Sequence, residues 1–360
     1  MSSSTIENQR SSQNGERQTA LVTGAMGFIG RRVVQNLVSR NQFKVRCLVR
    51  TNKVRGSANG AVDGISEFCE MVNGDLLSTE DCRRAVKDVS IIYHLAAGIE
   101  KSFAGAFMNS ALATRNLVEA ALETGRLKRI VNVSSFSVYS NLAMPRGAVL
   151  DESCPLETAF QERWDAYGFG KAKQDEIIIE YGRTRQLPYV ILRPGAVFGP
   201  GKRALTGRVG IDTFGLFLHM GGSKVLPLTY VDNCADAIVL AGLVPGVEGQ
   251  VFNVVDDDLL TSRQLLKAFK RAVGGFRSIR VPYSAAFALS AIWEKYSKWS
   301  QGQLPPVFNR RRCSAEWKAS QYSNRKLKEK LGWKPRIPMA EAVQLFLNQF
   351  EGDKSARSAD

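Results

Sequence analysis

The sequence is poor in the residues that bind metals or form disulfide frameworks. Its 360 residues include only two histidines and six cysteines, and no two cysteines are spaced as a CxxC pair. Zinc sites and disulfide-stabilised domains use closely spaced Cys or His residues, so no metal site and no disulfide framework is expected. Scattered cysteines fit a reducing compartment, and we expect a cytoplasmic protein.

The chain also lacks a long hydrophobic run. A membrane-spanning helix needs roughly 18 consecutive apolar residues, and the most apolar helix candidate, Ala285–Trp293, is about half that length. Residues 1–18 are polar and contain no apolar signal-peptide core, so they are interpreted as a disordered tail. The final residues, 351–360, are interpreted as a frayed tail. We therefore expect a soluble protein without a transmembrane span.

Acidic residues are outnumbered by basic ones, with a formal net charge of +15. Such an excess favours contact with phosphates of nucleic acids or of membrane surfaces. No nucleic-acid-binding motif accompanies the basic stretch 310–336, so nucleic acid is not expected as a partner. A solvated face is the first interpretation of this stretch, and contact with anionic lipid or with an acidic substrate is the alternative.

From Thr19 onward, short apolar runs alternate with segments of helical period. This alternation is typical of a parallel sheet covered by helices on both faces, so it predicts an α/β fold with a Rossmann-type doubly wound parallel sheet. One intervening helix carries Val33, Val34, Leu37 and Val38. The predicted strands are Ala20–Thr23, Lys44–Val49, Glu70–Val72, Ile91–Leu95, Arg129–Val133 and Tyr189–Leu192.

The alternation weakens after Pro194, where a smaller lobe is predicted to begin. The sequence predicts a larger domain over residues 19–194, to which a segment near residues 225–255 returns. A mostly helical, substrate-binding lobe is predicted over residues 195–350, with a helix capped at Thr261 or Ser262. The predicted helices of this lobe are Ser262–Val273, Tyr283–Trp299, Ser323–Leu331 and Met339–Phe350.

A glycine-rich turn, TGAMGFIG over residues 23–30, follows the first predicted strand and opens the first helix. Gly24 permits a tight turn, Gly27 lets the backbone approach a pyrophosphate, and Gly30 allows close helix packing. The helix N-terminus also offers free N–H groups to an anion. This placement predicts that the larger domain binds a dinucleotide. The other predicted cofactor contacts of the turn are Met26, Phe28 and Ile29.

Tyr167 and Lys171 are four residues apart, so on a helix both side chains emerge from one face. A free tyrosine has a pKa of about 10, and a nearby ammonium lowers it by favouring the phenolate. The pair is therefore a candidate for general acid/base catalysis. Tyr322 and Lys326 have the same spacing, but they lie in a basic segment far from the predicted cofactor domain and are interpreted as a coincidence.

The order of these motifs resembles the extended short-chain dehydrogenase/reductase family, also called the NAD-dependent epimerase/dehydratase superfamily. The likeness covers nearly the whole chain, and it implies that Ser135, counted back from Tyr139, assists Tyr167 at the reacting oxygen, with Ser134 as the fallback. Further segments that carry the likeness are ATRNLVEAA around Asn116, LRPGAVFGP at 192–200, YVDN at 230–233 and GWKP at 332–335.

The resemblance also implies the cofactor. In NAD-preferring members an acidic residue ends the second strand, whereas here Val49 is followed by Arg50. Arg forms charge-assisted bonds to phosphate oxygens, so NADP is expected, with NAD and a merely solvated Arg50 as the alternatives. His94 is interpreted as a packed residue at a strand end. The further implied cofactor contacts are Asp75, Leu76, Leu95, Ala96, Ala97, Asn116, Tyr167, Lys171, Pro194 and Val197.

Departures from the family pattern narrow the choice among the reactions that the family catalyses. Phe136 and Ser137 stand where sugar-nucleotide 4,6-dehydratases carry an acidic pair, which disfavours dehydration. The PxRxGD-like segment of nucleotide-sugar epimerases is missing, and an aromatic segment with Trp293, Tyr296 and Trp299 replaces it. This is more similar to the 3β-hydroxysteroid dehydrogenase-like branch. We therefore expect an NADP-preferring oxidoreductase that interconverts a secondary alcohol and a ketone on a small, hydrophobic or sterol-like substrate.

Two other functions stay open at this stage. A nucleotide-sugar epimerase or reductase, with transient C4 oxidation, would use Arg310–Arg312 as a diphosphate clamp. A protein that senses NADP without turnover would not need the Tyr167 and Lys171 pair, so its presence disfavours that reading. The aromatic segment is interpreted as core rather than pocket, because aromatic stripes at helical spacing are more often core. A homodimer is implied by the resemblance.

Overall fold

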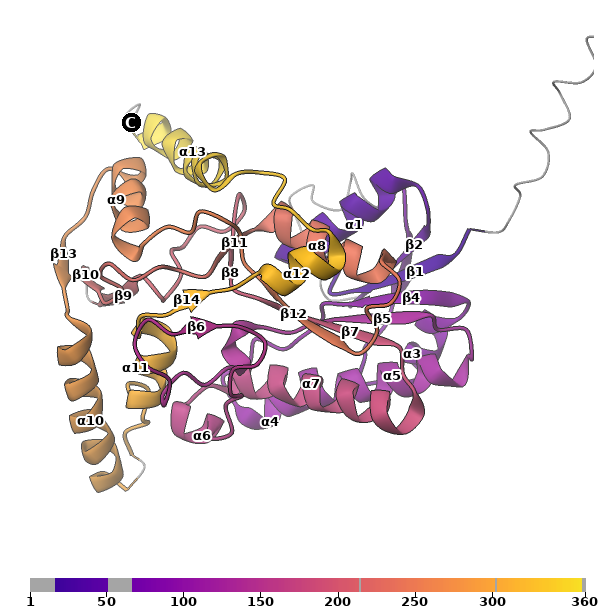
Figure 1. Cartoon of the computed structure of the whole chain (residues 1–360), viewed down its shortest axis with the longest axis horizontal. Helices are drawn as coiled ribbons and strands as arrows, with labels where there is room; N and C mark the ends of the chain where they lie inside the picture. The colour runs from indigo at the N-terminus through magenta and orange to yellow at the C-terminus, as the bar shows by residue number, and fades with distance from the viewer. Residues whose placement is uncertain (1–16, 51–66, 214, 302, 358–360) are drawn as a thin grey trace, which may run out of the picture.

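A computed structural model describes residues 17–50, 67–213, 215–301 and 303–357. Apart from Arg17 and Gln18, the predicted N-terminal tail lies outside these residues. Seven parallel strands form the central sheet in the order β3-β2-β1-β4-β5-β7-β12 (Figure 1). They are β1 (Thr19–Thr23), β2 (Lys44–Val49), β3 (Glu70–Asn73), β4 (Val89–His94), β5 (Arg129–Val133), β7 (Tyr189–Pro194) and β12 (Gln250–Val254).

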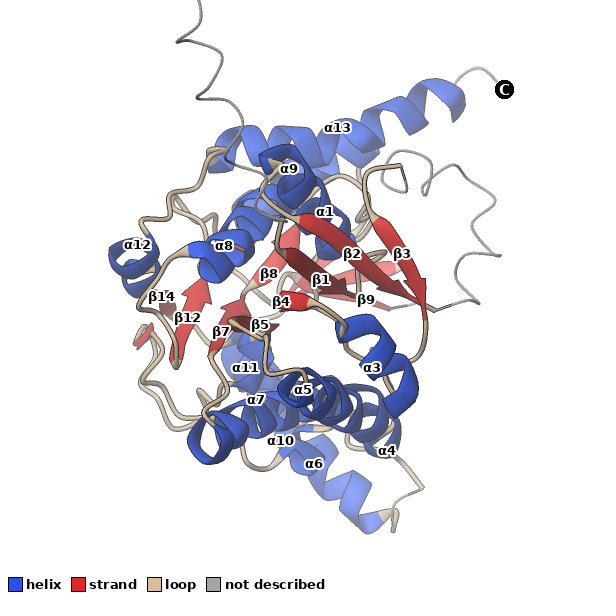
Figure 2. Ribbon diagram, turned by 90° about the vertical axis from the view of Figure 1, so that its right-hand side faces the viewer, coloured by secondary structure: helices blue, strands red, loops and turns tan. Residues whose placement is uncertain are grey.

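Helices cover both faces of this sheet (Figure 2). One face packs against α1 (Phe28–Arg40), α8 (Val231–Leu243) and α12 (Arg325–Leu331). The other packs against α3 (Thr79–Val86), α5 (Ala113–Glu123) and α7 (Ala166–Arg185). All five residues of β1 are buried because both faces of the strand are covered, and its three central residues are apolar. The predicted doubly wound α/β fold is confirmed.

The strand order reverses direction at β1, which lies between β4 and β2. Ligands of such sheets bind beyond the carboxyl ends of the strands at this switch point. Around these ends lie short elements that shape the site. They are α4 (Phe103–Ala106), the π-helix η2 (Phe107–Leu112), η3 (Phe136–Val138), α6 (Phe160–Arg163), the pair β8 (Ala196–Phe198) and β11 (Leu228–Tyr230), and the pair β6 (Val149–Leu150) and β14 (Gln321–Tyr322).

The C-terminal part is mostly helical, with one small sheet. α9 (Ser262–Val273) begins with a capping box at Thr261, one of the two predicted caps. α13 (Met339–Arg357) runs past the predicted end at Phe350, so residues 351–357 are helical, since no proline interrupts them. The remaining elements are β9 (Gly210–Thr213), β10 (Leu216–His219), β13 (Ser278–Arg280), α10 (Tyr283–Trp299) and α11 (Arg310–Trp317).

Candidate active site

The glycine-rich turn between β1 and α1 has room only for glycine at two positions. Gly24 has a φ of +69°, and a Cβ there would lie 2.8 Å from the backbone nitrogen of Ala96. A Cβ on Gly30 would collide with the carbonyl oxygen of Gly24. Both glycines therefore bring α1, the turn and the end of β4 into close contact. A flat, open backbone surface results at the switch point of the sheet.

The N-terminus of α1 fits an anionic group. Gly27 is its N-cap residue, and no side chain caps the first turn. The N–H groups of an uncapped first turn have no partner within the helix and carry the positive end of the helix dipole. Phe28, Ile29 and Met26 lie beside this turn and are partly buried against the core. The turn therefore fits the pyrophosphate of a dinucleotide.

The segment that follows β4 is held beside the turn. Thr23 Oγ1 lies 2.7 Å from His94 Nδ1 and accepts a hydrogen bond from the backbone N–H of Ala96 at 3.2 Å. Leu95 and Ala97, the neighbours of Ala96, are thereby placed along the same surface. Burial lowers the pKa of His94 to about 3, so its imidazole is neutral. This environment agrees with the interpretation of His94 as a packed residue at a strand end.

The other predicted cofactor residues lie at neighbouring carboxyl ends of strands. Asn116 on α5 donates its side-chain amide to the carbonyl oxygen of Leu76 at 2.9 Å, which holds the loop after β3 against α5. Asp75 accepts from the backbone N–H of Leu77 at 2.9 Å, closing the same loop. Pro194 ends β7 and Val197 lies on β8. These residues share one edge of the sheet with the glycine turn.

Arg50 follows the last residue of β2 and is exposed. Val49, which precedes it, is buried in the core. Because β2 is the neighbour of β1, the guanidinium belongs to the same carboxyl edge as the glycine turn. No carboxylate occupies position 49 or 50, so this edge offers a cation where an acidic residue would repel a phosphate.

The first turn of α7 positions Tyr167 and Lys171. The N-cap residue Asp165 accepts a hydrogen bond from the backbone N–H of Gly168 at 2.7 Å, which fixes where the helix begins. Lys171 is buried and donates from Nζ to the carbonyl oxygen of Val133 at 2.5 Å. Because Val133 ends β5, this bond ties the lysine to the sheet one helical turn below Tyr167.

The two candidate serines have different partners. Ser134 is buried and donates its hydroxyl to Asp175 at 2.9 Å, so it points into α7. Burial raises the pKa of Tyr167, whereas the Ser135 hydroxyl, which lines the same cavity, acts to lower it. Burial has the larger effect, so the pKa of Tyr167 is raised overall, with a further contribution from Asp165. The structure therefore places Ser135, rather than Ser134, in one cavity with the tyrosine.

Burial also changes the pKa of Lys171. It lowers this pKa to about 8, while the carboxylate of Asp175 acts in the opposite direction. Asp175 lies four residues further along α7 and accepts hydrogen bonds from Asn132 and Ser134. Sequence reasoning missed this aspartate. The spacing of residues 167, 171 and 175 on one helical face was the available signal.

A cavity of about 570 Å³ opens beside Ser135 and Tyr167. Besides Tyr167 it is lined by six aromatic side chains, and its charged lining residues are Arg163, Asp165, Arg208, Arg312 and Glu316. The aromatic lining residues, all missed from the sequence as site residues, are Phe136, Tyr139, Trp164, Phe308, Trp317 and Tyr322. The two candidate catalytic hydroxyls thus share one space with aromatic rings and with charged groups of both signs.

The second Tyr-x-x-x-Lys match does not form a comparable pair. Tyr322 lies on β14 and lines the cavity, whereas Lys326 lies on α12 and stands over the ring of Phe252, 5.4 Å from its centroid. The two residues belong to different elements and have different surroundings. Only the Tyr167 and Lys171 match lies on a single helix.

The three arginines of the predicted diphosphate clamp do not lie together in one site. Arg310 pairs with Glu294, at 2.8 Å between Nε and Oε2. Arg311 pairs with two carboxylates, those of Glu157 and Glu162. Arg312 alone of the three lines the cavity. The structure therefore brings one member of the proposed clamp to the candidate site.

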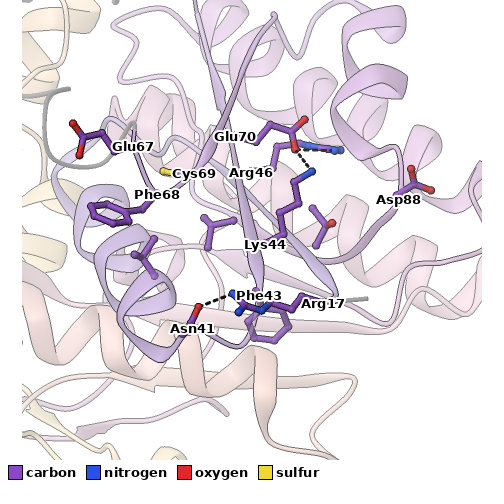
Figure 3. A pocket seen from close by; sticks show the side chains of 13 residues that line it. Arg17, Asn41, Phe43, Lys44, Arg46, Glu67, Phe68, Cys69, Glu70 and Asp88 are labelled. Atoms are coloured by element: carbon purple, nitrogen blue, oxygen red, sulfur yellow. Dashed lines mark hydrogen bonds and ion pairs between the residues drawn. The ribbon is translucent and has the colours of Figure 1, made fainter. Parts of the chain in front are cut away.

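A larger cavity, of about 870 Å³, lies at the opposite edge of the sheet (Figure 3). It is lined by Thr19 and Lys44, the first residues of β1 and β2, so it opens at the amino ends of the strands. Figure 3 shows Lys44 and Arg46 directed at Glu70, with nitrogen-to-oxygen distances of 3.3 and 3.1 Å. The catalytic candidates follow the carboxyl ends, so this cavity is remote from them.

Within the described ranges, no helix is both long and apolar enough to cross a membrane. In the same part of the chain, no cluster of three or more His, Cys, Asp or Glu side chains is placed to hold a metal ion.

Comparison with known proteins gives consistent matches. The sequence profile described as "NAD dependent epimerase/dehydratase family" matches residues 20–254. A 2-alkyl-3-oxoalkanoate reductase of Shewanella oneidensis is 27% identical over 308 residues, covering 81% of this chain and 76% of that protein. The 3beta-hydroxysteroid-dehydrogenase/decarboxylase isoform 1 of Arabidopsis thaliana is 24% identical, covering 92% and 79%.

A solved structure shares the fold. The UDP-glucose 4-epimerase of Thermus thermophilus, determined as a complex with NAD, superimposes with a TM-score of 0.68 at 23% identity, covering 93% of this chain and 99% of that one. The profile match spans the glycine turn, the Tyr167 helix and the whole central sheet. The chain therefore belongs to the NAD-dependent epimerase/dehydratase family and is an oxidoreductase-type enzyme of the extended short-chain dehydrogenase/reductase group.

Proposed function

We propose that this protein is an NADP-preferring oxidoreductase that interconverts a secondary alcohol and a ketone. The observation that carries the proposal is the arrangement of Tyr167, Ser135 and Lys171. The hydroxyls of Ser135 and Tyr167 line one cavity, and a buried lysine lies one turn further along the Tyr167 helix. This is the set of groups that proton transfer at a carbonyl or alcohol oxygen requires.

Each residue has a distinct role in the proposed reaction. Ser135 donates a hydrogen bond to the reacting oxygen and holds it beside Tyr167. Tyr167 gives its phenolic proton to that oxygen during reduction and removes the proton during oxidation. In its charged form Lys171, one helical turn away, would stabilise the phenolate that forms when Tyr167 gives up its proton. A nicotinamide cofactor, when bound, supplies or accepts the hydride.

The residues around the switch point of the sheet would hold that cofactor. The glycine turn and the uncapped N-terminus of α1 would hold the pyrophosphate, and the segment Leu95–Ala97 would flank the rest. Arg50 would bind the 2′-phosphate that distinguishes NADP from NAD. NAD is the alternative, since the structure of the Thermus thermophilus epimerase was determined as a complex with NAD.

We further propose that the substrate is hydrophobic or sterol-like. The aromatic side chains that line the 570 Å³ cavity support this class, since they match an apolar ligand body with one polar end at Ser135 and Tyr167. The names of the two relatives above, a reductase of 2-alkyl-3-oxoalkanoates and a 3β-hydroxysteroid dehydrogenase, point to similar chemistry. No disulfide joins any of the six cysteines, all of which lie in the described residues, and this supports a reducing, cytoplasmic location. We also propose that the protein forms a homodimer.

A nucleotide-sugar epimerase is the second candidate. Arg208 and Arg312 line the same cavity and would serve a diphosphate. Against it, Arg310 and Arg311 are paired with glutamates and so are not available as a three-arginine clamp.

A turnover screen separates the two candidates. Purified protein is incubated with NADP(H) or NAD(H) and with hydroxysteroids, 3-oxo acids, simple ketones or UDP-, GDP- and dTDP-sugars, and products are read by mass spectrometry. We expect net NADP(H) conversion with a hydrophobic alcohol or ketone. An isomerised nucleotide sugar without net cofactor change would establish the epimerase instead.

A further inference from the structure

α10 presents an apolar face to solvent. Every third or fourth residue of this helix from Ala285 to Trp299 is exposed and apolar or aromatic. The exposed fractions are 54% for Leu289, 65% for Ile292, 47% for Tyr296 and 76% for Trp299. The spacing places these side chains on one side of the helix. We call Ala285, Leu289, Ile292, Tyr296 and Trp299 the α10 apolar face.

The opposite side of α10 is fixed to the protein. Ala286, Ser290 and Ser297 are buried, and Ser297 donates from Oγ to the carbonyl oxygen of Leu304 at 2.5 Å. Trp293 donates from Nε1 to the carbonyl oxygen of Pro305 at 3.2 Å. Figure 1 shows α10 along the outer edge of the molecule, with α11 beside it. The sequence interpretation of this aromatic segment as core is therefore wrong for its Tyr296 and Trp299 rings, which stack in the open with centroids 5.7 Å apart.

The chain segment that contains the α10 apolar face is strongly basic. Residues 277–312 contain seven Lys or Arg residues and a single acidic residue, Glu294. That carboxylate is already engaged by Arg310. Lys295 and Lys298 are exposed on α10 itself, next to Ile292 and Trp299 in the last turns of the helix. An apolar and aromatic stripe is thus bordered by cations.

We propose that the α10 apolar face docks this protein onto an anionic lipid surface. Helices that lie in the membrane interface combine Trp and Leu on one face with Lys or Arg on another. Trp and Tyr suit the headgroup region, because their rings have an apolar body and a polar end. Negatively charged lipids attract basic residues near the surface.

A second copy of the chain fits this face less well. In a two-fold symmetric contact both copies use the same patch, so Lys295 and Lys298 of both copies would lie in one interface. Like charges placed together oppose such an association. An anionic surface instead gains from the exposed Lys295 and Lys298 beside this face. The charge therefore favours lipid over self-association.

The docking face is connected to the entrance of the candidate active site. Val307 is 42% exposed and lines the 570 Å³ cavity, and the loop that leads to it is held by Trp293 through Pro305. If the substrate is hydrophobic, docking would bring the cavity close to the lipid phase in which that substrate dissolves. This last step rests on the proposed function, whereas the docking itself does not.

The test is direct binding of the full chain to vesicles, without any activity measurement. Vesicles of phosphatidylcholine alone and of phosphatidylcholine with phosphatidylserine are sedimented with wild-type protein. We expect binding only to the anionic vesicles, loss of binding at high salt, and a blue shift of tryptophan fluorescence on binding. Failure to bind anionic vesicles would overturn the proposal, whatever the enzyme turns over.

Paired variants localise the contact. The double variant Ile292→Ser and Trp299→Ser should lose the fluorescence shift and most binding, while keeping its fold because both side chains are exposed. Lys295→Glu with Lys298→Glu should weaken binding about tenfold or more. Lys330→Glu with Lys334→Glu changes the net charge equally at another exposed site and should retain near wild-type binding.

Sedimentation velocity on the same proteins tests whether a second copy of the chain binds the α10 apolar face instead. A concentration-dependent dimer that dissociates in the Ile292→Ser and Trp299→Ser variant, with no vesicle binding by wild type, would assign the face to a second copy and refute lipid docking. Equal loss of vesicle binding in the Lys330 and Lys334 control would show that bulk charge alone drives binding, which would also refute the assignment to α10.

Discussion

Asp175 and Arg193 form a buried ion pair beneath the candidate catalytic lysine. Both Nε and Nη2 of Arg193 lie 3.1 Å from Oδ2 of Asp175, and both residues are almost fully buried. The pair joins α7 to β7, while Asn132 and Ser134 join the same carboxylate to β5 and the residue that follows it. The helix that carries Tyr167 and Lys171 is therefore attached to two neighbouring strands through one aspartate.

Replacing this aspartate should destabilise the fold. Asp175→Asn leaves the guanidinium of Arg193 buried without a counter-charge, so we expect a loss of about 3–5 kcal/mol in the free energy of unfolding, measured with urea. Glu119→Gln is the matched control, since it breaks the half-exposed pair with Arg115. That variant should lose less than about 1 kcal/mol. Similar losses in the two variants would contradict a special role for the buried pair.

Lys171 should make stability depend on pH. Its pKa is about 8 in the folded protein, against an ordinary value of 10.5. Between these values the unfolded chain binds more protons at this residue, so its contribution to the free energy of unfolding rises with pH across that window. Below pH 8 Lys171 is protonated in both the folded and the unfolded state. The cost of burying its charge then lowers the free energy of unfolding in full.

The variant Lys171→Met, which cannot titrate, isolates this effect. From about pH 7 to about pH 10, wild type should gain about 2 kcal/mol in unfolding free energy relative to the variant. Urea unfolding of both proteins at each pH measures the difference, and other titrating groups cancel to first order. A difference that stays constant with pH would mean that the pKa of Lys171 is not lowered.

Tyr167→Phe should lower kcat by about 100-fold or more, because the variant has no phenolic proton to transfer. Cofactor affinity, measured by fluorescence titration, should stay within about twofold, since the ring is kept. Tyr322→Phe is the matched control: this tyrosine lines the same cavity and belongs to the second Tyr-x-x-x-Lys match. It should retain most of the activity. If Tyr322→Phe lost activity while Tyr167→Phe retained it, Tyr322 would be the catalytic tyrosine instead.

The sequence predicted the central sheet well, because its strands are covered on both faces. A strand such as β1 has no solvent-facing residue, so its apolar run is visible without any knowledge of its neighbours. The glycine turn was recognisable for a similar reason, since Gly24 and Gly30 satisfy local steric demands. Both signals depend on residues close together in the chain.

The enclosure of the site was not predictable in this way. Phe136, Trp164, Phe308 and Tyr322 meet in one cavity although they come from four separate segments. The aromatic residues of α10 show the same limit, since a helical stripe indicates that one face is apolar but not what covers it. Long-range packing decides between pocket, core and surface. The choice between Ser134 and Ser135 likewise needed the position of Asp175, which only the fold supplies.

Arg50→Asp should weaken NADPH binding selectively. A guanidinium that bonds a 2′-phosphate contributes roughly 1.5–3 kcal/mol, so its loss should raise the Kd for NADPH by about tenfold or more. The new carboxylate would add repulsion toward that phosphate. NADH carries no phosphate there, so its Kd should change by less than about twofold.

The control variant Lys128→Asp makes the same change in charge at an exposed residue just before β5, at the amino edge of the sheet. If that control weakened NADPH equally, a general loss of positive charge would explain the result. If Arg50→Asp affected both cofactors alike, the 2′-phosphate would not contact this residue, and the proposed preference for NADP would lose its physical basis.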